Sequence, residues 1–295
     1  MKAITWMLLA VSLFHLEAHG QRMMMFKGSY SPNMQAAVIR DSTVIDTAQL
    51  SLAYRFTRTC EQATDSVRWC RIAVQVGRKV VKQQDVLRLY THLAYTNRRS
   101  NERWDAALKA NGNSGSDLFS ELYLDKATDS LTVVCGDWFD FDRMKDYRQA
   151  RPALKWQLHD ERADICGYVC HKATAEYGGR SWTVWYAPDI PLPIGPWKLS
   201  GLPGAILRAT DGGLFAFDCV AISRDPAPIV KYRYNSLQHL KSREAYLRYE
   251  RNCHERPYET FARGEKAYIV TTDAAGRLVY LDETWTIPYN PLELE

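Results

Sequence analysis

Residues 178–206 read GGRSWTVWYAPDIPLPIGPWKLSGLPGAI, and this stretch decides the fold. The run 180–187 is rich in aromatic and β-branched residues, as is the run 165–174 before it, and residues 177–179, Tyr-Gly-Gly, separate the two. Two such runs around a glycine-containing connection are typical of a β-hairpin. The stretch therefore predicts antiparallel strands.

A proline-rich loop follows the predicted hairpin. Five prolines and three glycines lie between Pro188 and Gly204. Proline lacks the N–H that a strand ladder needs and glycine costs backbone entropy, so the loop forms neither a helix nor a central strand. We expect a loop of fixed shape that resumes as a strand over 205–210, turns at Asp211-Gly212-Gly213 and pairs back over 214–222.

The loop also carries a resemblance to a known family. Residues 201–206, Gly-Leu-Pro-Gly-Ala-Ile, are similar to the motif that names the GLPGLI family of exported proteins from Bacteroidetes-type bacteria, with Ala205 in place of leucine. Further matching residues are Gly167 to Thr174, Gly179-Arg180, Ile190-Pro191, Gly195-Pro196-Trp197-Lys198, Asp211, Phe217-Asp218-Cys219 and Tyr289 to Leu294. The resemblance implies an exported protein and implies no particular activity.

The first twenty residues predict a secretory signal peptide. Met1-Lys2 is a short positive start, residues 3–14 are apolar, and Ala18-His19-Gly20 places small residues before a cleavage at Gln21. No later run has the roughly 18 continuous apolar residues of a membrane helix, and no cysteine follows the cleavage point for lipid attachment. We therefore expect a periplasmic or secreted protein without a transmembrane segment after cleavage.

Length and composition favour a single domain over residues 21–295, because no linker or repeat divides them. The net charge of +4 is spread along the chain, which argues against a nucleic-acid partner. Aromatic residues make up 12% of the chain and include nine tryptophans, enough for a thick core or for a ring-lined binding cleft.

The other segments predict further strands and two helical regions. Alternating or β-branched runs predict strands at 44–59, 71–77, 130–136, 156–159, 266–272 and 277–281, whereas residues 137–151 read as irregular. Helical spacing of apolar residues predicts helices over 85–110 and 237–253. Asn235 or Ser236 is the expected cap of the second helix, with Leu237, Leu240 and Leu247 facing inward.

Seven cysteines in an exported chain indicate disulfide bonds, because the compartment is oxidising. The candidate pairs are Cys60 with Cys70, Cys135 with Cys166 and, at positions where the resemblance places cysteine, Cys170 with Cys219. Joining Cys170 to Cys219 would pin the two ends of the loop, since both lie on predicted strands beside it. Cys253 is then left over.

The sequence has none of the common catalytic motifs HExxH, P-loop or strand-to-helix GxGxxG. Ser200 lacks the preceding glycine of a nucleophile elbow. Cys166 and Cys170 would share one face of a strand while His171 points to the other, which argues against a metal site. We therefore expect no metal and no cofactor.

The hairpin and loop supply the candidate contact residues, which are Arg180, Trp182, Trp185, Tyr186, Trp197, Lys198 and Asp211. The loop is expected to be shaped by Pro196, Gly201, Leu202, Pro203 and Gly204. Two interpretations stay open for the rings. They either pack inside the protein, or they form a recognition surface, since tryptophan and arginine are enriched at interface hot spots.

Together these features predict an α+β fold dominated by an antiparallel, curved sheet of about eight to eleven strands. The expected form is an open or incomplete barrel, like that of lipoprotein carriers, covered by two or more helices. The favoured function is a non-catalytic envelope protein that holds an apolar, lipid-like or peptide-like ligand or docks to an outer-membrane protein. A hydrolase without a recognisable motif and a purely structural envelope protein are the alternatives.

Overall fold

The structure of the protein is a computed structural model. It describes residues 17–18, 21–27, 39–59, 67–86, 121–136, 144–262, 267–272, 278–280, 284, 286, 289 and 291–294. The sequence predicted one domain over 21–295, whereas the chain groups into two compact units, one of residues 1–35 and 248–289 and one of residues 36–247 and 290–295. The expected signal peptide and the helix expected over 85–110 lie almost entirely outside the described residues.

The smaller unit contains a four-stranded sheet in the order β1 (Glu17–Ala18), β2 (Gln21–Lys27), β17 (Ala267–Thr272) and β18 (Leu278–Tyr280). Its neighbouring strands are antiparallel. Helix α4 (Pro257–Ala262) belongs to this unit, and helix α3 (Arg243–Glu255) runs across the boundary between the two units. Neither helix is long and apolar enough to cross a membrane, a statement that covers only the described part of the chain.

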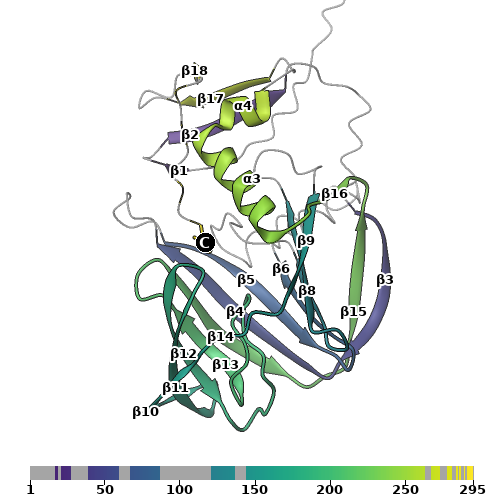
Figure 1. Cartoon of the computed structure of the whole chain (residues 1–295), viewed down its shortest axis with the longest axis vertical. Helices are drawn as coiled ribbons and strands as arrows, with labels where there is room; N and C mark the ends of the chain where they lie inside the picture. The colour runs from purple at the N-terminus through teal and green to yellow at the C-terminus, as the bar shows by residue number, and fades with distance from the viewer. Residues whose placement is uncertain are drawn as a thin grey trace, which may run out of the picture. The chain divides into compact units, whose positions relative to one another are not determined.

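The larger unit is built on a twelve-stranded sheet (Figure 1). Its strands follow in the order β10 (Gln157–Ile165), β11 (Tyr168–Tyr177), β12 (Arg180–Ala187), β13 (Ala205–Thr210), β14 (Phe215–Ser223), β4 (Leu50–Thr59), β5 (Val67–Val76), β6 (Val80–Asp85), β7 (Glu121–Asp125), β8 (Ser130–Gly136), β9 (Met144–Ala150) and β16 (Leu237–His239). All neighbours are antiparallel except β9 and β16. The sheet is open, with β10 and β16 at its two ends. The predicted antiparallel β fold is thus confirmed.

The predicted hairpin is formed by β11 and β12. Tyr177 pairs with Arg180, and Gly178 and Gly179 make the turn with φ of 62° and 70°. Glycine adopts this left-handed conformation without a steric penalty. Strands β13 and β14 follow as a second hairpin, with Thr210 opposite Ala216. This part of the sheet therefore forms as the sequence indicated.

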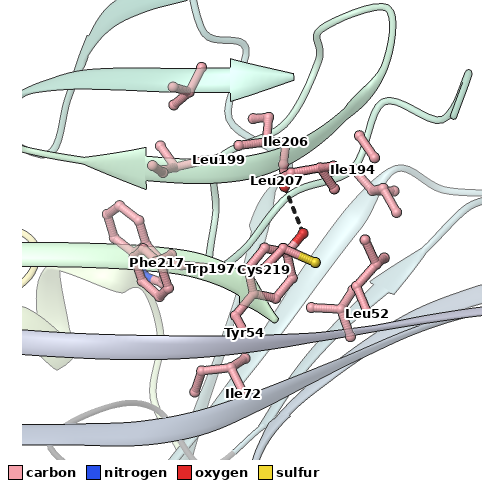
Figure 2. Close-up of a cluster of buried hydrophobic side chains, with 14 of the residues drawn as sticks. Leu52, Tyr54, Ile72, Ile194, Trp197, Leu199, Ile206, Leu207, Phe217 and Cys219 are labelled. Carbon is pink, nitrogen blue, oxygen red and sulfur yellow. Dashed lines mark hydrogen bonds between the residues drawn. The ribbon is translucent and has the colours of Figure 1, made fainter. Parts of the chain in front are cut away.

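The main core lies on the inner face of β4, β5 and β11 to β14, together with the loop 188–204. Alternate residues of β4 point into it, among them Leu52, Tyr54 and Phe56. The Tyr54 hydroxyl donates a hydrogen bond of 2.7 Å to the carbonyl of Ile206, which ties β4 to β13 (Figure 2). The buried hydroxyl is therefore satisfied, as a polar group inside a core must be.

A second, smaller core lies between the main sheet and a two-stranded ribbon. The ribbon pairs β3 (Ile39–Ala48) with β15 (Ala227–Tyr234), and Figure 1 shows it opposite β6, β8 and β9. The core is formed by Ile39, Tyr123, Val134, Met144 and Tyr234. Strands β6 to β8 are therefore buried on both faces.

Several predictions about secondary structure were wrong. Residues 137–151 include strand β9, in which Met144, Lys145 and Tyr147 are all buried, so no period-two alternation reveals it. The helix expected over 237–253 begins at Arg243, because Leu237 pairs with Met144 in β16. The observed cap is Ser242, which accepts a hydrogen bond of 3.3 Å from the N–H of Ala245.

The extent of the fold also differs from the expectation. The strand expected at 44–59 is two strands that separate at Gln49, and β15 was not predicted. The main sheet has twelve strands, more than expected. Within the described ranges the helices are α3 and α4, of 13 and 6 residues, and a cover of two or more helices over the sheet is not confirmed.

Candidate binding site for an extended segment

The loop 188–204 is held in one shape by its own backbone and by neighbouring side chains. The N–H groups of Ala205 and Ile206 bond the carbonyls of Ile190 and Ile194, at 3.0 and 2.9 Å. The side-chain amide of Gln83 donates to the carbonyls of Gly195 and Trp197, at 3.1 and 2.8 Å. Trp156 donates to the carbonyl of Ser200 at 2.9 Å. The loop is therefore a fixed part of the larger unit.

Two glycines allow the loop to pack this closely. A Cβ atom on Gly204 would lie 2.2 Å from the carbonyl oxygen of Ala187, and one on Gly195 would lie 2.4 Å from that of Leu199. Gly201 has a φ of 96°, and Leu202 is buried in the core. Pro196 accepts a hydrogen bond of 3.2 Å from the N–H of Leu199, and Pro203 precedes Gly204.

The large rings of the hairpin and loop lie mainly inside the protein. Trp182 and Trp197 are 0% and 5% exposed, and their ring centroids are 5.6 Å apart. Trp197 also packs against Tyr177 at 5.2 Å, and Trp182 against Phe217 at 6.2 Å. Tyr186 is buried as well, while Trp185 is partly buried. This placement favours the interpretation in which the rings form the core.

Two of the charged candidates, Arg180 and Lys198, bind residues 291–294. Pro291, Leu292, Glu293 and Leu294, which we call the PLEL segment, lie beside the turn of the β11–β12 hairpin, with a bend at Leu292. Arg180 donates to the carbonyls of Pro291 and Leu292, at 2.5 and 3.1 Å. The N–H of Leu294 donates to the carbonyl of Gly178 at 2.8 Å. The protein thus binds two carbonyls and one N–H group of the segment's main chain.

Arg180 is itself oriented by Asp211. Its Nη1 lies 2.9 Å from Asp211 Oδ2, and both side chains are buried. The other carboxylate oxygen of Asp211 accepts the N–H groups of Gly213, Leu214 and Phe215, at 3.2, 2.9 and 2.9 Å. The turn between β13 and β14 therefore fixes the carboxylate that positions Arg180.

The side chain of Glu293 is enclosed by donors. Arg243 Nε and the Tyr177 hydroxyl lie 2.6 and 3.1 Å from its Oε1, and Lys198 Nζ lies 2.5 Å from its Oε2. Lys198 also contacts the Tyr147 hydroxyl at 3.0 Å and Gln149 Oε1 at 3.3 Å. Charge-assisted hydrogen bonds of this kind are about twice as strong as neutral ones.

Burial sets the electrostatics of this cluster. Burial lowers the pKa of Lys198, and the carboxylate of Glu293 opposes that shift. Burial, and then the charge of Glu293, raise the pKa of the Tyr177 hydroxyl, so Tyr177 remains a donor at neutral pH. A buried ion pair is stable only when both charges keep their partners, and here the carboxylate has three donors. We call Tyr177, Gly178, Arg180, Lys198 and Arg243 the PLEL site.

A cavity of about 540 Å³ adjoins the PLEL site and shares Tyr177, Gly178 and Arg243 with it. Its lining consists of Arg148, Gln149, Ala150, Arg151, Pro152, Tyr177, Gly178, Gly179, Ser242, Arg243 and Glu244. Of its three arginines, Arg151 is paired with Asp129 at 2.9 Å and Arg243 with Glu293 at 2.6 Å. A ligand held at the PLEL site therefore has room to extend beyond it.

A second cavity, of about 480 Å³, lies between β15 and strands β7 to β9. Lys231, Lys241 and Arg148 line it, together with His239, whose Nδ1 lies 2.6 Å from Asp146 Oδ1. The side chain of His239 is 77% exposed. None of the candidate contact residues lines this cavity.

One pair of side chains of the kind that hydrolysis would require, a hydroxyl beside a histidine, lies away from both cavities. Thr174 Oγ1 lies 2.8 Å from His159 Nε2, but both belong to β10 and β11 and lie outside the linings of the two cavities. Within the described ranges, His, Cys, Asp and Glu side chains form no group of three or more suited to a metal ion.

The cysteines differ from the predicted pairs. Cys166, Cys170 and Cys219 are thiols, so neither Cys170–Cys219 nor Cys135–Cys166 is bonded in the structure. The two thiols of the predicted Cys170–Cys219 pair point to different carbonyls, that of Cys170 to Tyr168 and that of Cys219 to Ala221, each at 3.6 Å. Cys60 lies outside the described residues, so the predicted Cys60–Cys70 pair stays a prediction.

Sequence reasoning found Arg180, Lys198 and Asp211 but not what they bind. It missed Glu293 and Arg243, which meet at this site from positions 50 residues apart. The available signal was an acidic residue between two leucines in a segment otherwise apolar, Pro291-Leu292-Glu293-Leu294. Such a residue either faces solvent or has a buried partner.

No family model matches the chain, and no curated protein matches it in sequence. Two solved structures of PNGF-II, in space groups P21 and C2, are similar to it at 11% and 10% identity, with TM-scores of 0.43 and 0.47. The similarity covers 69% and 68% of this chain and 32% of the PNGF-II chain, so this chain spans about a third of that protein. A likeness this weak supports neither a shared fold nor a shared activity.

Proposed function

We propose that the protein is a non-catalytic binding protein of the bacterial cell envelope that holds extended, peptide-like ligands at the PLEL site. The observation that carries this proposal is that the site binds both the main chain and an acidic side chain of the PLEL segment. Arg180 binds two successive carbonyls, Gly178 accepts one N–H, and Lys198 and Arg243 bind one carboxylate. Main-chain bonds suit any extended peptide, while the charged donors select an acidic side chain.

The charge of the site supports an acidic ligand. Arg180, Lys198 and Arg243 carry three positive charges, and Glu293 and Asp211 carry the two carboxylates paired with them. If the PLEL segment leaves, Lys198 loses its carboxylate, and Arg243 keeps only that of Glu244, at 3.8 Å. Because uncompensated buried charge is costly, an emptied site favours another anionic segment. The ligand class is therefore an extended peptide with an acidic residue that follows an apolar one.

The PLEL segment then acts as a tethered competitor for the site. A tethered segment has an effective concentration in the millimolar range when its linker is short and flexible. A free peptide must exceed this concentration or bind more tightly. We therefore expect weak capture by the intact chain and stronger capture once the segment is removed.

The proposal includes the cellular context expected from the sequence. We propose that the protein belongs to the GLPGLI family, is exported after cleavage before Gln21, and has the incomplete, carrier-like barrel covered by helices. Its ligand would then come from an outer-membrane or envelope protein. Cell fractionation with N-terminal sequencing tests export, and a mature protein that begins at Met1 would contradict it.

The binding test uses a peptide with the sequence of residues 289–295 and a variant that lacks residues 290–295. We expect the shortened protein to bind the labelled peptide in fluorescence anisotropy and to gain thermal stability from it. A matched peptide with Glu293→Gln should bind at least about tenfold more weakly, a difference of roughly 1.4 kcal/mol. A folded, shortened protein that binds neither peptide would overturn the proposal.

A second variant keeps the test decisive if the shortened protein does not fold. A protease site placed before Asn290 in the full chain lets the segment fold in place and be cut afterwards. The cut segment should exchange with labelled peptide, and Lys198→Met should speed its release. A cut segment that never exchanges would show a purely structural role.

A further inference from the structure

Three cysteine thiols approach one another where the β10–β11 hairpin meets β14. Cys166 and Gly167 form the turn of that hairpin, between Ile165 and Tyr168. Cys170 follows on β11, and Cys219 lies on β14, next to Tyr54 in the core shown in Figure 2. The turn of the hairpin and β14 are therefore close in space although β12 and β13 stand between β11 and β14 in the sheet.

Cys166 and Cys219 are in direct contact. The thiol of Cys166 donates a hydrogen bond of 3.1 Å to the carbonyl of Cys219. The Cys219 thiol is directed to the carbonyl of Ala221 at 3.6 Å, and burial, followed by the nearby Cys166, raises its pKa. Cys170 instead directs its thiol to the carbonyl of Tyr168, at 3.6 Å. Cys166, not Cys170, is thus the natural partner of Cys219.

The thiols of Cys166 and Cys219 differ in solvent exposure, as is useful for thiol–disulfide exchange. Cys166 is exposed to solvent, whereas Cys219 is 6% exposed. An oxidant can therefore reach Cys166 first. Burial also raises the pKa of Cys170 to about 11, so that buried thiol has little thiolate at neutral pH.

The backbone at Cys166 supports a specific use of this side chain. Its φ of 53° lies in the left-handed region, which residues other than glycine, asparagine and aspartate rarely adopt. Such conformations are energetically costly and are found at functional positions as well as in tight turns. Gly167 follows with a φ of 79°. The direction of the Cys166 side chain is therefore set by the turn conformation and not by the alternation of a strand.

We infer that Cys166 and Cys219 form a redox-active dithiol, which a small disulfide or a disulfide-exchange protein converts to a Cys166–Cys219 bond. The Cys166 thiolate attacks the disulfide of the co-reactant, and one of its sulfurs leaves as a thiolate that takes up the proton of Cys166. The Cys219 thiolate then attacks the mixed disulfide, and the second sulfur leaves and takes up the proton of Cys219. Two protein thiols are oxidised and one disulfide is reduced to two thiols.

The bond would close a loop between residues 53 positions apart. It would join the hairpin turn to β14 and so fix the curvature of β10 to β14. A cross-link stabilises mainly by limiting the unfolded chain, and more so for longer loops. The oxidised protein should therefore melt at a higher temperature than the reduced protein.

The test is a peptide map of the full chain without reduction, after incubation with oxidised glutathione. We expect the peptides that carry Cys166 and Cys219 to be linked in the unsubstituted protein and in the control variant Cys170→Ser. The link should disappear in Cys166→Ser, whose exposed position leaves the core unchanged, and in Cys219→Ala. Oxidation should raise the melting temperature of the unsubstituted protein and leave that of Cys166→Ser unchanged.

Two results would overturn the inference. One is a link between Cys170 and Cys219 in place of the expected one. The other is full reactivity of both Cys166 and Cys219 with a maleimide in the unfolded protein after the glutathione treatment.

Discussion

Lys198 and Glu293 lie 95 positions apart in the sequence and form a buried ion pair, Nζ to Oε2. Lys198 belongs to the proline-rich loop, and Glu293 to the PLEL segment. The pair therefore joins the proline-rich loop to a segment that is distant from it in the sequence. It also gives the sharpest test of how the PLEL site is stabilised.

Removal of one partner should cost more than removal of both. Glu293→Gln leaves Lys198 buried without its carboxylate, and we expect the free energy of unfolding to fall by roughly 3–5 kcal/mol. In the double variant Lys198→Met/Glu293→Gln the loss should be smaller than the sum of the two single losses, because no uncompensated charge remains. Urea denaturation of all four proteins measures this coupling. Additive losses would mean that the two charges do not depend on each other.

Substitutions at glycine test the fixed shape of the loop. Gly204→Ala places a Cβ 2.2 Å from the carbonyl oxygen of Ala187, so the backbone must shift. We expect a loss of about 1–3 kcal/mol or more in unfolding free energy. Gly213→Ala is the matched control, since no atom lies within 4 Å of its added Cβ. Equal melting temperatures for the two variants would argue against a tightly packed loop.

Trp197 distinguishes a core role from a recognition role. It is 5% exposed and packs against Trp182 and Tyr177. Trp197→Ala should therefore lower the free energy of unfolding by about 3–5 kcal/mol. The control Leu158→Ala, at a side chain that is 58% exposed, should change it by no more than about 0.5 kcal/mol. A stable Trp197→Ala protein that has lost ligand capture would support the recognition role instead.

Asp46 should contribute to acid sensitivity. Its carboxylate accepts the backbone N–H groups of Thr47, Lys79 and Val80, at 2.8, 2.7 and 3.2 Å. Burial by itself would raise the pKa of Asp46, but these bonds and the Lys79 charge hold it below its ordinary value of 3.8. The stabilisation is therefore complete above the unfolded pKa and is lost as the pH falls through the lower folded pKa.

Asp46→Asn measures this contribution. The variant should be less stable at neutral pH by about 1 kcal/mol, because charged hydrogen bonds to the turn at Gly77 are lost at a partly exposed site. The difference from the unsubstituted protein should shrink as the pH falls below 3.8. Thermal melts between neutral pH and acid, with the exposed Asp189→Asn as control, record it. A constant difference at every pH would mean that the charge of Asp46 plays no part.

The part of the fold that the sequence predicted is the part with strong local signals. Strands β11 to β14 alternate around glycine turns, and the prolines between them can form only a loop. Strand β9 was missed because Lys145 is buried beside Met144 and Tyr147, so both faces read as mixed. Helix α3 was started too early because Leu237 and Leu240 have helical spacing but are held by the sheet at β9.

The sequence predicted part of the binding site, namely the charged residues of the hairpin, the loop and the turn after β13, but not the segment that binds there. Arg180, Lys198 and Asp211 stand out in the sequence because charges beside a stiff, aromatic loop are unusual. The segment that Arg180 and Lys198 bind could not be predicted from local sequence, because Glu293 and Lys198 are 95 positions apart. The rings of Trp182 and Trp197 also stand out beside the stiff loop, but their large hydrophobic area is buried in the core.

The open sheet has one more consequence, at β10. A strand at the end of a sheet offers unpaired N–H and C=O groups, on which the strand of another molecule can add and begin a fibril. Strand β10 carries the run His159-Asp160-Glu161-Arg162, and most of its residues are exposed. A second copy that docked there would have to bring these charges together and strip them of water. Among the described elements β11 is the sheet neighbour of β10, and these charges oppose aggregation at its other edge.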